Sequence, residues 1–140
     1  MAYGSLFSTK LIADGQYAEA VEASGREIAA SPGDPEPYFN RARGWAGLER
    51  WEDAVRDYQR ALEHDAGASA IDPAEIDDEL FFALRRWAES ERDRDHDPAR
   101  AIGLLDRYAT LCPDGRHLLD LETWRDHLRG VKKVWVREAL

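Results

Sequence analysis

The densest set of potential metal ligands in this sequence is the acidic run Asp93-Arg94-Asp95-His96-Asp97. Alternating carboxylates of this kind open calcium-binding loops, because they converge on one hard cation. The rest of that loop pattern is missing, since Pro98 stands in place of the turn-forming glycine and Leu104 in place of the closing glutamate. Asp97 is also well placed to cap a following helix. We therefore predict a solvated turn rather than a metal site.

A second acidic group could in principle perform acid–base chemistry. It comprises Glu75, Asp77, Asp78 and Glu79. Paired carboxylates do such work only in an enclosed pocket that separates their pKa values. Here they follow Asp72-Pro73, which favours a helix start, and carboxylates in the first turns of a helix are stabilised by its dipole. A structural role is the favoured interpretation.

The remaining reactive side chains show no catalytic pattern. The four histidines lack the spacing of zinc ligands. They are His64, His96, His117 and His127. The single cysteine, Cys112, precedes Pro113 at an expected helix end and is interpreted as a packing residue. Because the sequence also lacks a nucleophile elbow, a phosphate loop and a dinucleotide fingerprint, we predict a protein that is not an enzyme and binds no cofactor or metal.

Charge and hydropathy exclude two further classes of partner. The net charge of −9 argues against nucleic acid, whose phosphates require concentrated Lys and Arg. The chain has no long uncharged apolar run, which argues against a membrane span and favours a cytoplasmic location. Its 140 residues are enough for one compact domain with a real core.

An internal repeat is the strongest organising signal. Tyr17 corresponds to Trp51, Ala20 to Ala54 and Ile28 to Leu62 at one constant offset. That offset is about 34 residues, which is the period of the tetratricopeptide repeat. The segment from Tyr38 through Trp45, Trp51, Ala54, Tyr58 and Ala61 closely resembles that family's alternation of aromatic and small residues.

The resemblance to tetratricopeptide-repeat proteins implies an all-α fold, a right-handed superhelical stack of antiparallel helix hairpins. Aromatic residues such as Tyr17, Trp45 and Trp87 would then pack between helices rather than bind a cofactor. We expect a single domain over residues 1–130, with repeats at about 3–33, 34–66 and 72–114 and a capping helix at about 116–130. Residues 131–140 would form a tail or extend that helix.

The first helix of the third repeat departs from the pattern. If Trp87 corresponds to Trp45, the turn from Glu91 to His96 is several residues longer than usual. The register of that helix is therefore open.

The resemblance also implies a peptide-binding groove lined by the first helix of each repeat. In the first repeat the positions are Ser5, Thr9 and Ile12, in the second Glu36, Phe39, Arg43 and Gly47, and in the third Asp78, Phe81, Arg85 and Glu89. Asn40 resembles the central asparagine of the clamp that holds chaperone C-terminal tails in some members. The other clamp positions carry different residues, namely Ser5, Thr9, Asp78 and Phe82, so chaperone-tail binding of that kind is not expected.

Two pairs within this set share one spacing. Phe39 with Arg43 and Phe81 with Arg85 are each four residues apart, on one helical face. If both pairs line the groove, they favour an acidic partner peptide with an apolar anchor. The alternative is that Phe81 or Arg85 is turned into the stack or onto the outer surface.

These observations predict a protein–protein interaction adaptor or chaperone-like module. The alternative is a self-assembly module, in which Val134-Trp135-Val136 packs on a neighbouring copy to form a homodimer.

Overall fold

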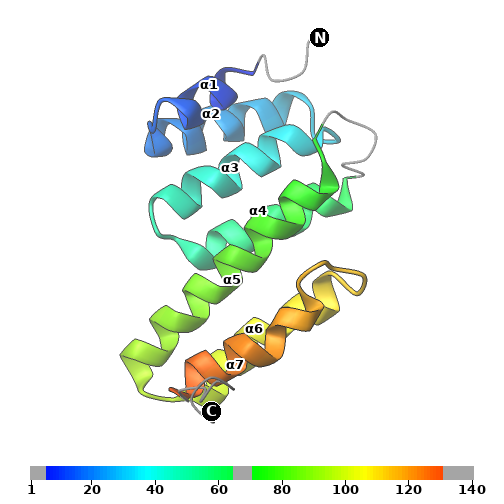
Figure 1. Cartoon of the computed structure of the whole chain (residues 1–140). Coiled ribbons are helices and arrows are strands. Elements are labelled where there is room, and N and C mark those ends of the chain that lie inside the picture. The colour runs from blue at the N-terminus through cyan, green and yellow to red at the C-terminus, as the bar shows by residue number, and fades with distance from the viewer. Residues whose placement is uncertain (1–5, 65–70, 131–140) are drawn as a thin grey trace, which may run out of the picture.

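The computed structural model describes residues 6–64 and 71–130, and within these ranges the protein is all-α (Figure 1). Seven α-helices and one short 3-10 helix make up the described chain. They are α1 (Phe7–Ala13), α2 (Tyr17–Ala30), α3 (Pro35–Gly47), α4 (Trp51–Glu63), α5 (Pro73–Asp95), α6 (Pro98–Leu111), η2 (Leu118–Asp120) and α7 (Leu121–Arg129).

Three of the helices begin with the same Asp-Pro pair, in which Asp is the N-cap and Pro the first helical residue. The side chains of Asp34, Asp72 and Asp97 each accept a hydrogen bond from a backbone N–H in the first turn, at 3.0 Å. The proline that follows each of them needs no donor at that position. The starts of α3, α5 and α6 are therefore fixed locally, as the sequence predicts for α5 and α6.

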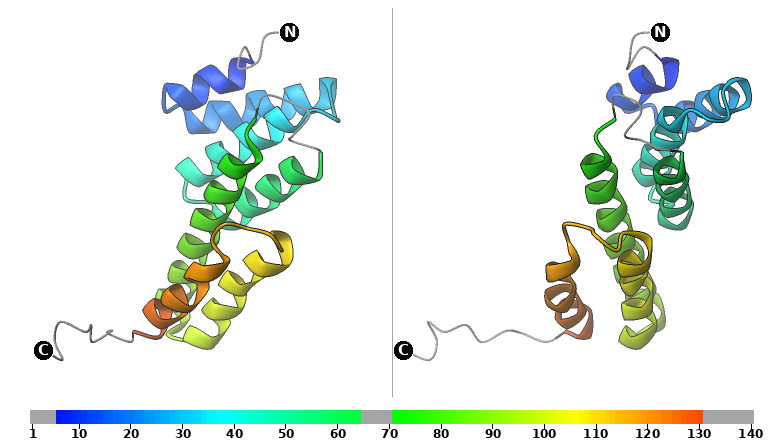
Figure 2. Two further views of the ribbon diagram at one scale, coloured as in Figure 1. Left: turned by 45° about the vertical axis from the view of Figure 1, so that its right-hand side comes forward. Right: turned by 90° about the vertical axis from the view of Figure 1, so that its right-hand side faces the viewer.

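Each helix packs on the next along the chain. Close contacts join every consecutive pair of α-helices from α1 to α7, and α5 additionally contacts α7. In the right-hand view of Figure 2, α2 and α4 lie toward one side and α5 and α7 toward the other. The three helix pairs α1–α2, α3–α4 and α5–α6 fall inside the three ranges predicted for repeats, and α7 falls inside the range predicted for a final helix.

Small residues are among the most completely buried positions of the molecule. The alanines that the core buries completely include Ala20, Ala42, Ala54, Ala61, Ala83 and Ala101. Large side chains are buried as completely, among them Tyr58, Tyr108 and Leu84. The core of the second and third helix pairs therefore combines small, aromatic and large aliphatic residues.

The predicted long turn from Glu91 to His96 is wrong. Helix α5 continues to Asp95 and ends at His96, whose φ of 55° is left-handed. Charged residues support the added turns, because Glu91 accepts from the Trp87 indole at 3.3 Å and forms an ion pair with Arg94. The connection to α6 is therefore short, and α5 is long. The prediction of a tail or helix extension at residues 131–140 concerns a segment outside the described residues.

The packing at Ala54 yields a direct test. Ala54→Leu should lower the free energy of unfolding by about 1–3 kcal/mol, because three added carbons cannot fit where the side chain is 0% exposed. Ala109→Leu, at an exposed position of α6, is the matched control and should change stability by less than about 0.5 kcal/mol. Urea denaturation of both variants provides the comparison. Equal stability of the two would contradict the close helix crossing.

Candidate functional site

An open cleft of about 420 Å³ is lined by residues of α1, α2, α3, α4 and α5, and we call it the central cleft. Its apolar wall includes Ile12, Tyr17, Trp51 and Phe82. Its polar lining includes Arg43, Asp78 and Glu79. The cleft thus draws residues from all three helix pairs, which are distant in sequence.

Arg43 lies in the central cleft as predicted, but it is not a free cation. Its Nε is 3.1 Å from a carboxylate oxygen of Glu79, and its Nη2 is 3.5 Å from one of Glu75. The guanidinium carbon also lies 4.8 Å from the centre of the Phe39 ring. The positive charge that would favour an acidic partner at Arg43 is therefore balanced by carboxylates of α5.

Glu79 belongs to a partly buried polar network that joins three helices. The Tyr58 hydroxyl of α4 donates to the same carboxylate oxygen that Arg43 binds, at 3.1 Å. Burial raises the pKa of Glu79, and the positive charge of Arg43 opposes that effect. Burial also raises the pKa of Tyr58 well above its usual 10, with the charge of Glu79 adding to it.

The polar residues predicted for the first two repeats instead hold α1 against α3. The Asn40 amide donates to the hydroxyl of Ser8 at 2.8 Å and to that of Thr9 at 3.0 Å. Thr9 in turn donates to Glu36 at 3.0 Å. Because Asn40 is 2% exposed and Glu36 is 7% exposed, these side chains serve the fold and present little surface to a partner.

Phe39 and Phe81 are core residues, contrary to the prediction that they offer contact area. Both are nearly fully buried, at 4% and 3% exposed. The Phe81 ring stacks on the His117 ring at 4.6 Å between centres. The alternative interpretation, with Phe81 turned into the stack, is therefore the right one. Because α5 packs on α4, α6 and α7, more of its circumference is buried than one apolar stripe indicates.

The exposed aromatic residue of α5 is Phe82, one position further along. It is 46% exposed, lines the central cleft and lies 5.9 Å from the Trp51 ring in an edge-to-face arrangement. Arg85 is half-buried and stacks on Trp124 of α7, with 3.8 Å between the guanidinium carbon and the ring centre. Sequence reasoning missed Phe82 and Trp124 because both contacts depend on the rotation of α5 about its axis.

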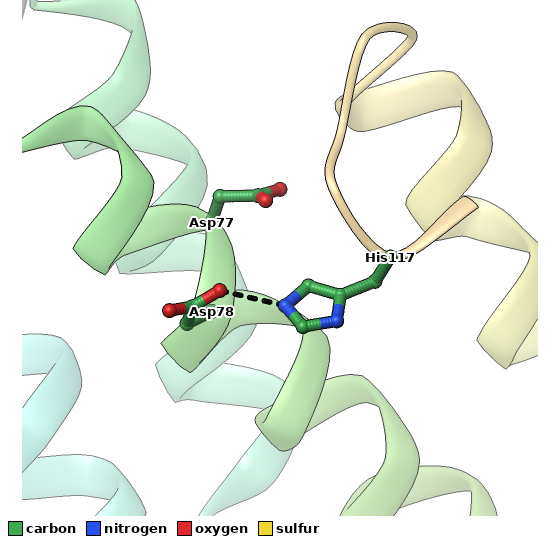
Figure 3. Close-up of side chains that lie close together, drawn as sticks. All are labelled: Asp77, Asp78 and His117. Atoms are coloured by element: carbon green, nitrogen blue, oxygen red, sulfur yellow. Dashed lines mark hydrogen bonds and ion pairs between the residues drawn. The ribbon is translucent and has the colours of Figure 1, made fainter. Parts of the chain in front are cut away.

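A second cluster, drawn in Figure 3, brings Asp77, Asp78 and His117 together. The Asp78 carboxylate lies 2.6 Å from His117 Nε2. Asp77 accepts from the Tyr108 hydroxyl at 2.7 Å and from the Arg116 backbone N–H at 3.2 Å. These bonds fasten the segment between α6 and α7 to the start of α5.

The geometry of this cluster is that of hydrogen bonding rather than metal coordination. Two ligand atoms on a tetrahedral zinc are about 3.3 Å apart, given bond lengths of about 2.0–2.2 Å. The shorter Asp78–His117 distance is that of a direct hydrogen bond, and both oxygens of Asp77 already accept hydrogen bonds. The Arg116 guanidinium also lies 3.4 Å from Asp78. We assign the cluster a structural role.

Cys112 adjoins the same cluster. Its thiol is buried, and burial raises its pKa to about 12, with Asp77 adding to the effect. A thiol in this state stays protonated at neutral pH and is a poor nucleophile. The packing role predicted for Cys112 agrees with this environment.

The acidic run at the end of α5 is occupied by local interactions. Asp95 lies 3.3 Å from Arg94 and 3.4 Å from Arg100, and Asp97 caps α6. The cap is as predicted, but Asp93 and Asp95 are helical and do not lie in a turn.

Comparisons with known proteins leave the chain's family open. No protein-family model matches it, and no curated protein matches it significantly. In the part of the chain that the structure describes, no helix is both long and apolar enough to span a bilayer.

Removing one carboxylate of the cluster tests its structural role. Asp77→Asn should lower the free energy of unfolding by about 1.5–3 kcal/mol, because it weakens charge-assisted bonds to Tyr108 and Arg116 at a site that is 8% exposed. Asp120→Asn, on the exposed side of His117, should stay within about 0.5 kcal/mol of wild type. A rise in melting temperature with zinc that Asp77→Asn abolishes would overturn the assignment.

The raised pKa of Glu79 makes stability depend on pH. A carboxyl group with a higher pKa in the folded than in the unfolded state destabilises the fold increasingly as pH rises above its usual 4.5. Glu79→Gln keeps an acceptor and removes the ionisation. The difference in melting temperature, variant minus wild type, should therefore be more positive at pH 7 than at pH 4. If that difference is instead more negative at pH 7 than at pH 4, the positive charge of Arg43 affects the pKa of Glu79 more than burial does.

Proposed function

We propose that this protein is a tetratricopeptide-like interaction module that holds a segment of a partner protein in the central cleft. The proposal is supported by the period of about 34 residues, by buried alanines at the helix crossings and by the order of the helix pairs. A right-handed superhelical stack is part of this proposal. Binding, as an adaptor or chaperone-like module, would be the whole activity, and the proposed location is the cytoplasm.

The observation that carries the proposal is the exposed ring of Phe82 in the wall of the cleft. An exposed apolar side chain marks an interaction site when it belongs to a contiguous apolar patch in a hollow, rather than standing alone on the surface. Phe82 lies beside Trp51, with Ile12 also in the lining, so the three form an apolar surface from three helix pairs. An apolar side chain of the partner would be the anchor there.

The polar lining of the cleft favours a partner that forms no ion pair with Arg43. Its guanidinium is already bound by Glu79 and Glu75, so a ligand carboxylate would have to displace them. An Arg43→Glu variant would place a third carboxylate beside those two and would disturb the fold as well as binding. Phe82 is the cleaner position for a test.

Affinity capture with a photo-crosslinking amino acid at position 82 tests the proposal. A partner covalently captured there should bind the Phe82→Ala protein more weakly by about 2 kcal/mol, as expected for a central aromatic anchor. Calorimetry with the purified partner provides the affinity. Leu119→Ala removes an apolar side chain outside the cleft that is even more exposed, at 96%, and should bind as wild type does.

Two outcomes would reject cleft binding. One is equal binding by the Phe82→Ala and wild-type proteins. The other is capture of a second copy of this chain alone, in a dimer that dissociates when residues 131–140 are deleted, which would favour the self-assembly alternative.

A further inference from the structure

Arg85 has an unusual environment for a cation in this acidic chain. Its guanidinium carbon lies 3.8 Å from the ring centre of Trp124, 5.3 Å from that of Phe82 and 5.8 Å from that of Phe81. Aromatic faces attract a cation and hold the guanidinium plane in place. The side chain is therefore positioned by α5 and α7 together.

Within the described residues, no carboxylate lies within ion-pairing distance of this cation. The Arg85 Nε is enclosed and has no hydrogen-bond partner there. Arg41, by contrast, has a carboxylate oxygen at 2.7 Å, and Arg125 has one at 2.9 Å. A half-buried guanidinium without an acceptor carries an uncompensated desolvation cost.

The charges around Arg85 do not offset the effect of its burial. Burial lowers the pKa of Arg85, and the adjacent charge of Arg86 lowers it further. The negative charge of Glu89 raises the pKa of Arg85, but the Glu89 carboxylate lies 3.5 Å from His127 Nε2. An added anion at Arg85 would relieve the imbalance rather than displace an existing ion pair.

We propose that Arg85, Phe82 and Trp124 form a carboxylate-binding subsite next to the central cleft. The occupant is a carboxylate of the partner's peptide segment, and an apolar side chain of the same segment lies on the exposed face of Phe82. Continuity with the cleft supports this, since the Phe82 ring lines the cleft and is also a neighbour of Arg85. The inference rests on the proposed function and adds the chemistry of the partner to it.

Arg85 suits this role better than Arg43 does. A planar guanidinium binds a carboxylate through two parallel hydrogen bonds, and stacking on Trp124 lowers the entropy lost on binding. Arg43 would first have to release Glu79, 3.1 Å away. The sequence assigned the acidic partner to Arg43 and Arg85 together, and this proposal keeps Arg85 alone, at the α5–α7 side of the cleft.

Selection from a randomised peptide library on the full chain tests the subsite. Enriched peptides should carry an Asp, a Glu or a free C-terminus next to a large apolar residue. Synthetic copies should bind Arg85→Gln about 10- to 100-fold more weakly than wild type, as expected for loss of a charged hydrogen bond. Amidating the C-terminus, or replacing the acidic residue by its amide, distinguishes a terminal from a side-chain carboxylate.

Arg107→Gln is the matched control, because Arg107 also lies over an indole ring, 5.4 Å from the centre of Trp87, and lines a different cavity. It should bind as wild type does, and Arg85→Lys should lose part of the affinity because it keeps charge without the planar fork. Peptides that bind Arg85→Gln as tightly as wild type but lose affinity for Phe82→Ala would reject the subsite and leave cleft binding intact. No enrichment over an unrelated helical protein would reject both.

Discussion

The position of α5 is the constraint on which the rest of the structure depends. This helix packs on α4, α6 and α7, so several of its faces are buried at once. Ile76, Leu80, Ala83 and Leu84 are all 0% exposed along it. A helix buried on several sides cannot rotate without opening cavities or burying charge, and its few exposed side chains are correspondingly well fixed.

Two of the polar networks among the described residues are attached to this helix. Asp77 and Asp78 hold the segment between α6 and α7 against its first turns, and Glu79 links it to Arg43 and Tyr58. Buried polar groups of this kind favour one arrangement of helices over others, because a shifted register would leave them unpaired. The networks thus fix the orientation in which α5 presents Phe82 and Arg85.

Much of the fold follows from short-range signals in the sequence. Each Asp-Pro pair sets a helix start through one side-chain bond and one proline, and the alanines at the repeat period mark the crossings. The end of α5 was less predictable, because Glu91 and Arg94 support extra turns through their own interactions. The groove was predicted only in part. Ile12 and Arg43 line the cleft, whereas Phe39 and Phe81 are buried.

Whether a predicted groove residue lines the cleft or is buried depends on the direction of its side chain around the helix axis. Neighbouring positions on a helix differ by about 100° in direction, so Phe81 and Phe82 face very different surroundings. The identity of the exposed one depends on the combined packing of α4, α6 and α7 on α5, which no local pattern records. The pairing of Arg85 with Trp124 likewise joins residues of two helices whose relative placement is a tertiary property.

Partner binding across the cleft and its α5–α7 side is the central claim, and tryptophan indole N–H resonances test it most directly. Trp51 lines the cleft and Trp124 stacks on Arg85, whereas Trp45 lies under Arg50 and Trp87 donates to Glu91. In a two-dimensional ¹H–¹⁵N spectrum, addition of a bound partner peptide should shift the Trp51 and Trp124 signals and leave those of Trp45 and Trp87 in place. Shifts confined to Trp45 and Trp87 would place the partner elsewhere and contradict the account.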